Sequence, residues 1–268
     1  MKQDAFSERW ERLEVTRDAD APEVGIVRLA RPEKLNAIDA RMHAELQEAC
    51  ARLERDPSVR VVIFTGAGRA FSAGADLGQP ARGGRSGFAA DALAVREPPL
   101  VERDRAVMGA RTAEAIERLP QVTIGAVNGL AVGGAVVLLA CMDLRVADAT
   151  AWFSIPEVPL GIPLTWGALP RLLRELGPAR TRELVLFGDR FTAEEAWRWG
   201  FVNRVVAPGM AFEAARELAR RLVSLDPIAV AVTKSEVRAL ADAMVPASVA
   251  HADADLLLLS RALRSRRE

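Results

Sequence analysis

The sequence predicts an α/β fold followed by a purely helical C-terminal region. Short apolar segments rich in β-branched residues alternate with segments whose apolar residues recur at helical spacing. This alternation stops near Pro208, beyond which only helical periodicity remains. A length of 268 residues suits one large core with an appended segment. We therefore expect a core over residues 1–207 and a helical region over residues 208–268.

The first half of the chain contains most of the expected strands. An acidic, proline-containing turn at residues 18–22 separates the first two strands. The apolar residues Met42, Leu46 and Leu53 share one helical face. Residues 78–87 are rich in Gly, Arg and Pro and predict a mobile loop. The elements expected here are strands at 14–17, 24–30, 59–65 and 122–127, and a helix at about 39–55.

The second half begins with a glycine turn and an apolar helix and then becomes helical. Thr192 and Glu195 have the spacing of a capping box for a helix that runs through Trp199. Residues 202–206 predict a last strand, and three helices are expected after it. The final one, near residues 247–263, carries four consecutive leucines, so we expect it to dock on the core or on another subunit.

The composition excludes several classes of function. The 36 basic and 36 acidic residues cancel, so no basic stripe favours nucleic acid as a partner. The N-terminal segment is charged, and we expect a cytoplasmic protein with no membrane partner. Cys50 and Cys141 are expected as buried free thiols. With only two histidines and no tyrosine, a multi-histidine metal site and phenol-dependent mechanisms are excluded.

Three segments carry residue types suited to chemistry. Residues 66–76 follow a strand, but Phe71 stands where a dinucleotide-binding fingerprint needs its third glycine, so a nucleotide site is disfavoured. Residues 126–135 join a strand to an apolar helix through glycines. Residues 153–161 embed a single acidic residue, Glu157, in an apolar stretch braced by prolines.

Each segment has a chemical interpretation and an ordinary one. A buried helix N-terminus leaves N–H groups unpaired, and glycines let an acceptor approach them. Burial disfavours an ionised carboxylate, so the pKa of Glu157 should rise, as a general base requires. Taken singly, however, glycines after strands usually form turns only, and a lone glutamate is more often a salt-bridge partner or a helix cap. The combination of the three segments is what indicates a catalytic site.

With these segments in place, the sequence resembles the crotonase, or enoyl-CoA hydratase/isomerase, superfamily over roughly residues 12–240. The resemblance implies a spiral of ββα units and a helical C-terminal part that builds homotrimers, often paired into homohexamers. The motifs that carry it are, in chain order, residues 31–37 (RPEKLNA), residues 71–76 (FSAGAD), Asn128-Gly129, Gly133-Gly134, Asp143, Pro156-Glu157 and Leu160-Gly161.

The resemblance also implies a mechanism. The backbone N–H groups of Ala73 and Gly134 would form an oxyanion hole for the thioester carbonyl of an acyl-CoA substrate, and Glu157 would be the catalytic carboxylate. Such donors stabilise the enolate oxygen as it gains charge, so no metal or redox cofactor is implied. The contacts to coenzyme A would map onto Lys34, Leu35, Ala37, Ala73, Asp76 and Leu77, largely through backbone atoms.

One position departs from the hydratase pattern. Hydratases of this family hold water between two glutamates, and the first of these is replaced here by Val137. Water addition needs an oriented water as well as a proton for the α-carbon, and one carboxylate serves both needs less well. A single glutamate beside an aliphatic residue resembles the 3-enoyl-CoA to 2-enoyl-CoA isomerases. We therefore expect an isomerase in which Glu157 is both base and acid.

Two alternatives remain open. The protein could be a hydratase or related lyase that works with Glu157 alone, or a catalytically silent acyl-CoA-binding protein, a hypothesis motivated by Val137. Trp166 either shapes the acyl pocket or packs beside it. Many members of the family continue with a further helix that often covers the CoA adenine, and the resemblance leaves the adenine contacts open here.

Overall fold

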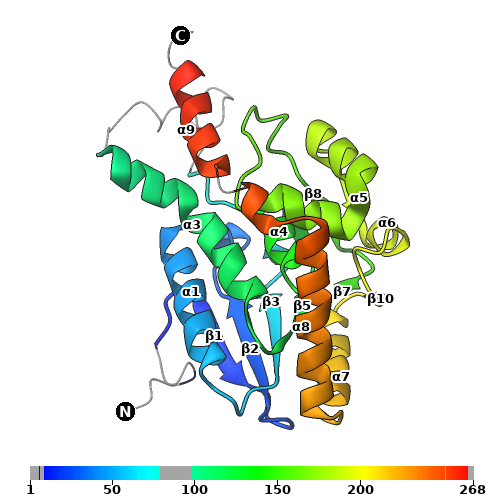
Figure 1. Ribbon diagram of the computed structural model, residues 1–268. Coiled ribbons are helices and arrows are strands. Elements are labelled where there is room, and N and C mark those ends of the chain that lie inside the picture. Colours follow the sequence, from blue (N-terminus) through cyan, green and yellow to red (C-terminus); the bar gives the residue numbers. More distant parts are fainter. Residues whose placement is uncertain (1–5, 7–8, 79–97, 251, 265–268) are drawn as a thin grey trace.

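Two β-sheets form the framework of the fold in the computed structural model, which describes residues 6, 9–78, 98–250 and 252–264. The larger sheet has six strands in the order β1-β2-β3-β5-β7-β10. Strand β1 is antiparallel to β2, and the other neighbours are parallel. Their bounds are β1 Leu13–Arg17, β2 Val24–Leu29, β3 Val61–Gly66, β5 Val122–Val127, β7 Leu144–Asp148 and β10 Arg204–Val206. The α/β class predicted from the sequence is therefore confirmed (Figure 1).

The smaller sheet is built from short strands that follow strands of the larger one. Its order is β4-β6-β8-β9, and their bounds are β4 Ala70–Ser72, β6 Leu130–Val132, β8 Trp152–Ser154 and β9 Phe191–Thr192. Three times the chain runs from a strand of the large sheet to a strand of the small sheet and then into a helix. These helices are α3 Pro99–Glu117, α4 Gly134–Ala140 and α5 Ala168–Phe187. This succession is the repeated ββα unit that the resemblance implied.

Strand β3 shows how the large sheet separates two cores. Its alternating side chains point to opposite faces, as the pleat requires. Val62 and Phe64 belong to the core shared with α1 (Ala40–Glu54) and α3, whereas Val61 and Ile63 belong to the core covered by α7 (Ala211–Val223). Because both faces are buried, the strand reads as a continuous apolar run.

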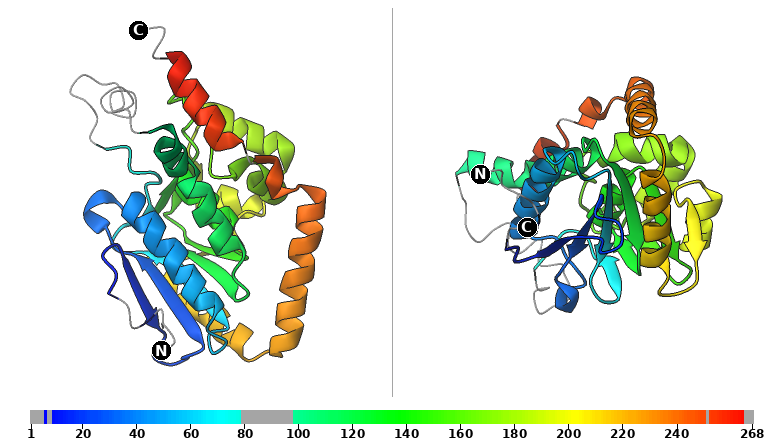
Figure 2. Two further views of the ribbon diagram at one scale, coloured as in Figure 1. Left: turned by 60° about the vertical axis from the view of Figure 1, so that its left-hand side comes forward. Right: turned by 90° about the horizontal axis from the view of Figure 1, so that it is seen from below.

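The C-terminal helices differ in how much they bury. Helix α7 packs on the large sheet, whereas no residue of α8 (Pro227–Met244) is buried, and α8 lies along the outside of the fold (Figure 2). A short 3-10 helix, Ala247–Ala250, leads to α9 (Asp253–Arg264), which packs against α3. Of the four leucines, Leu257 is buried, while Leu256 and Leu259 stay exposed.

The sequence located some elements and missed others, among them the 20-residue helix α5 and the strands β7 and β9. The capping box is confirmed, because the Thr192 hydroxyl accepts the Glu195 N–H and the Glu195 carboxylate accepts the Thr192 N–H at the start of α6 (Ala193–Arg198). Strands β4, β6 and β8 were not predicted, since three residues are too few to show a period. The predicted C-terminal helix is divided before α9. Most of the loop expected at residues 78–87 lies outside the described residues.

Candidate active site

A cavity of about 460 Å³ lies between α1, α3, α9 and the start of α4. Its lining comes from the segment after β4, the turn from β6 into α4, and the chain between β8 and α5. The structure brings seven predicted residues to this cavity, namely Ala73, Asp76, Leu77, Gly134, Val137, Glu157 and Trp166. Lys34, Leu35 and Ala37 do not line it.

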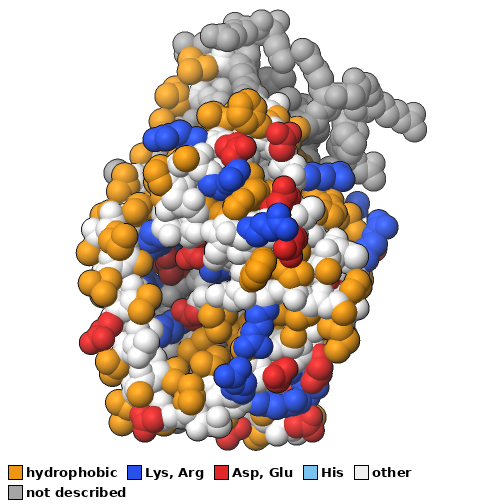
Figure 3. All heavy atoms as spheres, turned by 90° about the vertical axis from the view of Figure 1, so that its right-hand side faces the viewer, with side chains coloured by type: hydrophobic (Ala, Val, Ile, Leu, Met, Phe, Trp, Pro, Cys, Tyr) orange, Lys and Arg blue, Asp and Glu red, His pale blue; other side chains and the backbone are white. Residues whose placement is uncertain are grey.

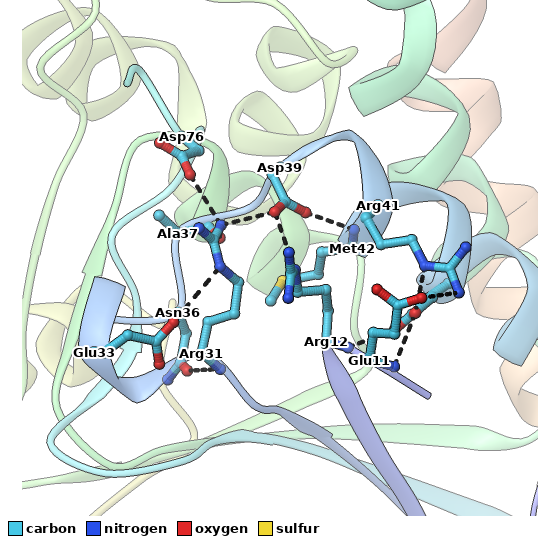
Figure 4. Close-up of polar contacts among 11 residues, drawn as sticks. Glu11, Arg12, Arg31, Glu33, Asn36, Ala37, Asp39, Arg41, Met42 and Asp76 are labelled. Carbon is cyan, nitrogen blue, oxygen red and sulfur yellow. Dashed lines mark hydrogen bonds and ion pairs between the residues drawn. The ribbon is translucent and has the colours of Figure 1, made fainter. Parts of the chain in front are cut away.

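A buried arginine, Arg31, holds in place the segment after β4 that lines the cavity. Arg31 donates from Nη1 to the Ala37 carbonyl at 2.8 Å and to Asp76 Oδ2 at 2.9 Å. Figure 4 shows the Arg31 guanidinium between Asp39 and Asp76. Burial alone would raise the pKa of Asp76, but the Gly78 N–H and Arg31 outweigh it, and the pKa is lowered. The ionised Asp76 carboxylate therefore fixes the position of the backbone segment around it, because it accepts hydrogen bonds from Arg31 and from the Gly78 N–H.

The prediction that the Ala73 amide is an oxyanion-hole donor is wrong. The Ala73 N–H donates to the Leu35 carbonyl at 2.9 Å, so it is already used within the fold. The Asp76 N–H likewise donates to the Ile38 carbonyl at 3.0 Å. Ala75, which lies between them, lines the cavity, and its N–H donates no hydrogen bond within the described residues.

Gly134, the first residue of α4, supplies a second amide beside Ala75. Its N–H donates no hydrogen bond within the described part of the chain, as expected for a helix start. Gly74 makes the approach possible: a Cβ there would lie 2.3 Å from the Val132 carbonyl oxygen and 3.2 Å from the Gly134 nitrogen. The segment after β4 can therefore pack directly on the start of α4.

Glu157 carries its carboxylate into the cavity without a partner. Its Oε2 is buried and makes no hydrogen bond to any described residue. Burial raises the pKa of this carboxyl from 4.5 to about 7, as the apolar sequence context predicted. The residue is neither a salt-bridge partner nor a helix cap within the described chain. A Cβ at Gly133 would lie 2.5 Å from Glu157 Oε1, so only glycine fits beside the carboxylate.

Among the described lining residues, no second glutamate stands opposite Glu157. Val137 is fully buried and lines the cavity one turn into α4. Asp76 is the only other carboxylate among the described lining residues, and it is bound to Arg31. Glu157 is therefore the carboxylate of this cavity that is free to exchange a proton.

Trp166 forms a wall of the cavity and touches two helices. It has a φ of +66°, a left-handed conformation that is uncommon for a bulky residue. A Cβ added at Gly109 in α3 would lie 2.1 Å from Trp166 Nε1, and one added at Gly134 would lie 2.3 Å from the indole ring. The two glycines therefore make room for this side chain. A glycine inside α3 was the signal in the sequence for this close approach.

His43 is a cavity residue that sequence reasoning missed. It lies on α1, and its Nδ1 is 2.8 Å from Thr112 Oγ1 on α3. Burial lowers the pKa of His43 to about 4, so the ring is neutral at physiological pH. Its position beside Met42 and three residues before Leu46, on the buried face of α1, could have revealed it. Arg105 and Arg261 also line the cavity and were not predicted.

The described residues hold no cluster suited to a metal ion and no helix that could span a membrane. No group of three or more His, Cys, Asp or Glu side chains there is arranged to hold a metal ion. No helix in the same part of the chain is long and apolar enough to cross a membrane. Cys50 and Cys141 are buried free thiols, and burial raises the pKa of each to about 12, as expected for structural cysteines.

Comparisons with known proteins agree with this architecture. The family model described as enoyl-CoA hydratase/isomerase matches residues 20–267. A carnitinyl-CoA dehydratase from Salmonella arizonae is 40% identical over 236 residues, which is 88% of this chain and 83% of the relative. A mevalonyl-coenzyme A hydratase from Beauveria bassiana is 37% identical over 215 residues, covering 80% of this chain and 75% of the relative.

Solved structures show the same fold. The crystal structure of an enoyl-CoA hydratase from Bacillus anthracis matches with a TM-score of 0.74 and 33% identity, covering 85% of this chain and 82% of that one. An enoyl-CoA hydratase/isomerase from Xanthobacter autotrophicus matches with a TM-score of 0.81 and 27% identity, covering 94% and 88%. The chain belongs to the enoyl-CoA hydratase/isomerase family of the crotonase superfamily.

Proposed function

We propose that this enzyme moves a proton at the α-carbon of an acyl-CoA thioester, with Glu157 as both base and acid. The observation that carries the proposal is the buried Glu157 carboxylate, whose Oε2 has no hydrogen-bond partner in the described chain and whose pKa is raised to about 7. A general acid–base group works best when its pKa lies near the working pH. The reaction then needs no metal or redox cofactor, because the charge that develops sits on the thioester oxygen.

The amides of Ala75 and Gly134 are the proposed donors to that oxygen. Both line the cavity, and neither N–H is used within the described residues. Donors fixed in advance stabilise the enolate more than the neutral thioester, and one such donor typically contributes about 3 kcal/mol. Ala75 takes the role that the sequence had assigned to Ala73.

The first candidate reaction is reversible hydration of a 2-enoyl-CoA. It is supported by the relatives, which are named as a dehydratase and a hydratase. In this direction water adds its oxygen to the β-carbon, and Glu157 delivers a proton to the α-carbon. Dehydration reverses both steps. With Val137 in place of a first glutamate, Glu157 alone would have to activate the water.

The second candidate is isomerisation of a 3-enoyl-CoA to a 2-enoyl-CoA, and Val137 favours it. Glu157 would remove the α-proton and return it to the γ-carbon, so no water takes part. An aliphatic wall at Val137 keeps water from the enolate. This reaction needs a single carboxylate, which is what the cavity offers.

The test is to incubate the protein with 2-enoyl-, 3-enoyl- and 3-hydroxyacyl-CoA esters in deuterated water and to follow mass and double-bond position. Hydration or dehydration with deuterium at the α-carbon supports the first candidate. Migration of the double bond without gain of water supports the second. Binding without exchange on any ester would identify a silent acyl-CoA-binding protein and overturn the proposal.

Two substitutions sharpen this test. Glu157→Gln keeps the size of the side chain and should lower the rate about 100- to 10,000-fold while leaving CoA-ester binding nearly unchanged. Val137→Glu should raise hydration of crotonyl-CoA, and Val137→Gln is its control because it adds volume without a carboxylate. Equal hydration by the Glu and Gln variants would contradict a role for the second carboxylate.

We also propose that the protein assembles as a homotrimer or a homohexamer. The support is the surface of α8, where Ile228, Val237, Leu240 and Met244 are all more than half exposed. Apolar side chains clustered on one helix are a common sign of a subunit interface.

A further inference from the structure

One polar side chain in the cavity has no part in the proposed proton transfer. His43 lies on α1 with 6% of its surface exposed, and it lines the cavity on the side of α3. The ring meets the Trp166 indole edge to face, with centroids 4.8 Å apart and an interplanar angle of 75°. A buried imidazole in a mostly apolar wall calls for a hydrogen-bond partner at each nitrogen.

The contacts of Thr112 Oγ1 indicate that Nδ1 carries the ring proton. Thr112 Oγ1 donates its single hydrogen to the Met108 carbonyl at 3.1 Å and accepts from Gln47 Nε2 at 2.9 Å. His43 Nδ1 lies 2.8 Å from the same oxygen. All three contacts are satisfied together only if Nδ1 donates, because Thr112 has no second hydrogen to give. The other nitrogen, Nε2, is then an acceptor.

His43 Nε2 has no partner in the described chain. Within the described residues, the only hydrogen bond of the His43 side chain is the one at Nδ1, and Nε2 is not enclosed by protein atoms. Nε2 is neither enclosed by protein atoms nor hydrogen-bonded within the described chain, so it is accessible from the cavity that His43 lines. Burial keeps the ring neutral, so Nε2 offers a lone pair rather than a positive charge. The group that pairs with such an atom is a hydrogen-bond donor, and on an acyl chain that donor is a hydroxyl group.

We propose that His43 Nε2 accepts a hydrogen bond from a hydroxyl group on the acyl chain, and that His43 thereby selects hydroxylated acyl-CoA esters. The inference rests on the proposed function, which places an acyl-CoA in the cavity. A ligand without the hydroxyl would bury Nε2 unpaired, and sites built around a hydrogen bond discriminate strongly against such ligands. A ligand carboxylate is disfavoured at this atom, because two acceptors would face each other.

The first test reads the tautomer directly and requires no turnover. The sequence contains only two histidines, so ¹⁵N NMR of the labelled protein gives two imidazoles, and His251→Gln assigns them. We expect a neutral ring with hydrogen on Nδ1 and none on Nε2. Thr112→Val removes the acceptor for Nδ1 and should mix the tautomers. A hydrogen on Nε2 in the parent protein would overturn the proposal.

The second test measures the preference for a hydroxyl. Butyryl-CoA, both enantiomers of 3-hydroxybutyryl-CoA, and 4-hydroxybutyryl-CoA are titrated by calorimetry into chains carrying Glu157→Gln, so that no ester is turned over. With His43 present, at least one hydroxylated ester should bind about 10-fold more tightly than butyryl-CoA. His43→Leu should abolish this preference, and His43→Gln, whose amide oxygen reaches a similar place, should restore part of it.

The outcomes separate this inference from the proposed function. Binding of all esters with equal affinity, with or without His43, would overturn the hydroxyl role alone. Failure of every CoA ester to bind would overturn the proposed function and this inference with it. A shift of the Nε2 signal that is the same with butyryl-CoA as with the hydroxylated esters would show that a trapped water is the donor, and would also overturn the inference.

Discussion

At the scale of single residues, the site depends on polar groups left without partners. Ionisation of a buried carboxylate is costly unless something pairs with it, and Glu157 has neither an ion pair nor a hydrogen bond at Oε2 among the described residues. Gly133 leaves room for the Glu157 carboxylate, because the Cβ of any other residue there would lie 2.5 Å from Glu157 Oε1. Asp76 is the opposite case, because Arg31 and the Gly78 N–H keep it ionised. The two carboxylates therefore have different roles.

The raised pKa of Glu157 predicts how stability depends on pH. The folded protein binds this proton more tightly than the unfolded chain, so the contribution to stability is full below pH 4.5 and is lost as the pH rises through about 7. Glu157→Gln removes the titration. Relative to the parent, its free energy of unfolding should increase by about 3 kcal/mol between acid and mildly alkaline pH.

Urea unfolding of both proteins at several pH values checks this expectation. Asp76→Asn is a control of opposite sign: the pKa of Asp76 is lowered, so this variant should lose stability relative to the parent as the pH rises from acid to neutral. A stability difference between Glu157→Gln and the parent that does not change with pH would contradict the assignment.

At the scale of elements, the Trp166 side chain joins α3 to the start of α4. Its left-handed backbone conformation is held by the following residue, because the Gly167 N–H donates to Asp253 Oδ2 of α9 at 2.7 Å. Helix α9 thus supports the cavity wall as well as lining it. The conformation of Trp166 therefore depends on packing against α3, α4 and α9 and not on the local propensity of the sequence.

Gly109 gives a direct test of this packing. Gly109→Ala places a methyl group 2.1 Å from Trp166 Nε1, and it should destabilise the protein by about 1–3 kcal/mol. In a Trp166→Gly background the same change should be neutral or stabilising, since alanine is the better helix former. Chemical denaturation of the four proteins in this cycle measures the coupling. An unchanged cost without the indole would show that the clash lies elsewhere.

The capping box of α6 gives a second prediction at this scale. Thr192→Ala removes the hydroxyl that accepts the Glu195 N–H and should lower the free energy of unfolding by about 1 kcal/mol. Thr192→Ser keeps the hydroxyl and should retain most of that stability. Thermal or chemical unfolding of both variants checks the cap, and equal losses in the two would contradict it.

At the scale of the whole molecule, several large apolar side chains lie exposed on the surface, most clearly on α8. Figure 3 shows hydrophobic side chains among charged ones over one face of the molecule. On α8 they are large, with Ile228 73% and Met244 82% exposed. Lys234 ties this helix to the body of the fold through Asp143 at 2.7 Å, yet α8 buries no residue within the chain. Such a helix is better explained by a subunit interface than by the monomer.

The assembly prediction follows from α8. Light scattering should give a molar mass three or six times that of the 29.0 kDa chain. Val237→Glu combined with Leu240→Glu should shift the protein toward smaller species, because charge on an apolar interface is costly. Circular dichroism of the smaller species should show retained helix content. A monomeric parent protein would contradict the prediction.

The sequence predicted the long strands, the capping box and the position of Glu157, because each leaves a local pattern: a β-branched run, a fixed spacing, or an acid among apolar residues. It assigned the wrong amide at Ala73. The direction of an N–H depends on which strand pairs beside it, and the pairing with residues 35–38 is formed only in the fold. His43 was missed for a similar reason, since its partner Thr112 lies 69 residues away.

The sequence by itself determined the family, the α/β class and the single apolar-embedded carboxylate, since motifs and periodicity are properties of neighbouring residues. Only the tertiary structure decided which groups meet in the cavity. It selected Ala75 over Ala73, set Trp166 against two glycines, and left one nitrogen of His43 open to a ligand. The physical reason is that hydrogen bonds and packing between distant segments decide which polar groups are used inside the fold and which remain for a substrate.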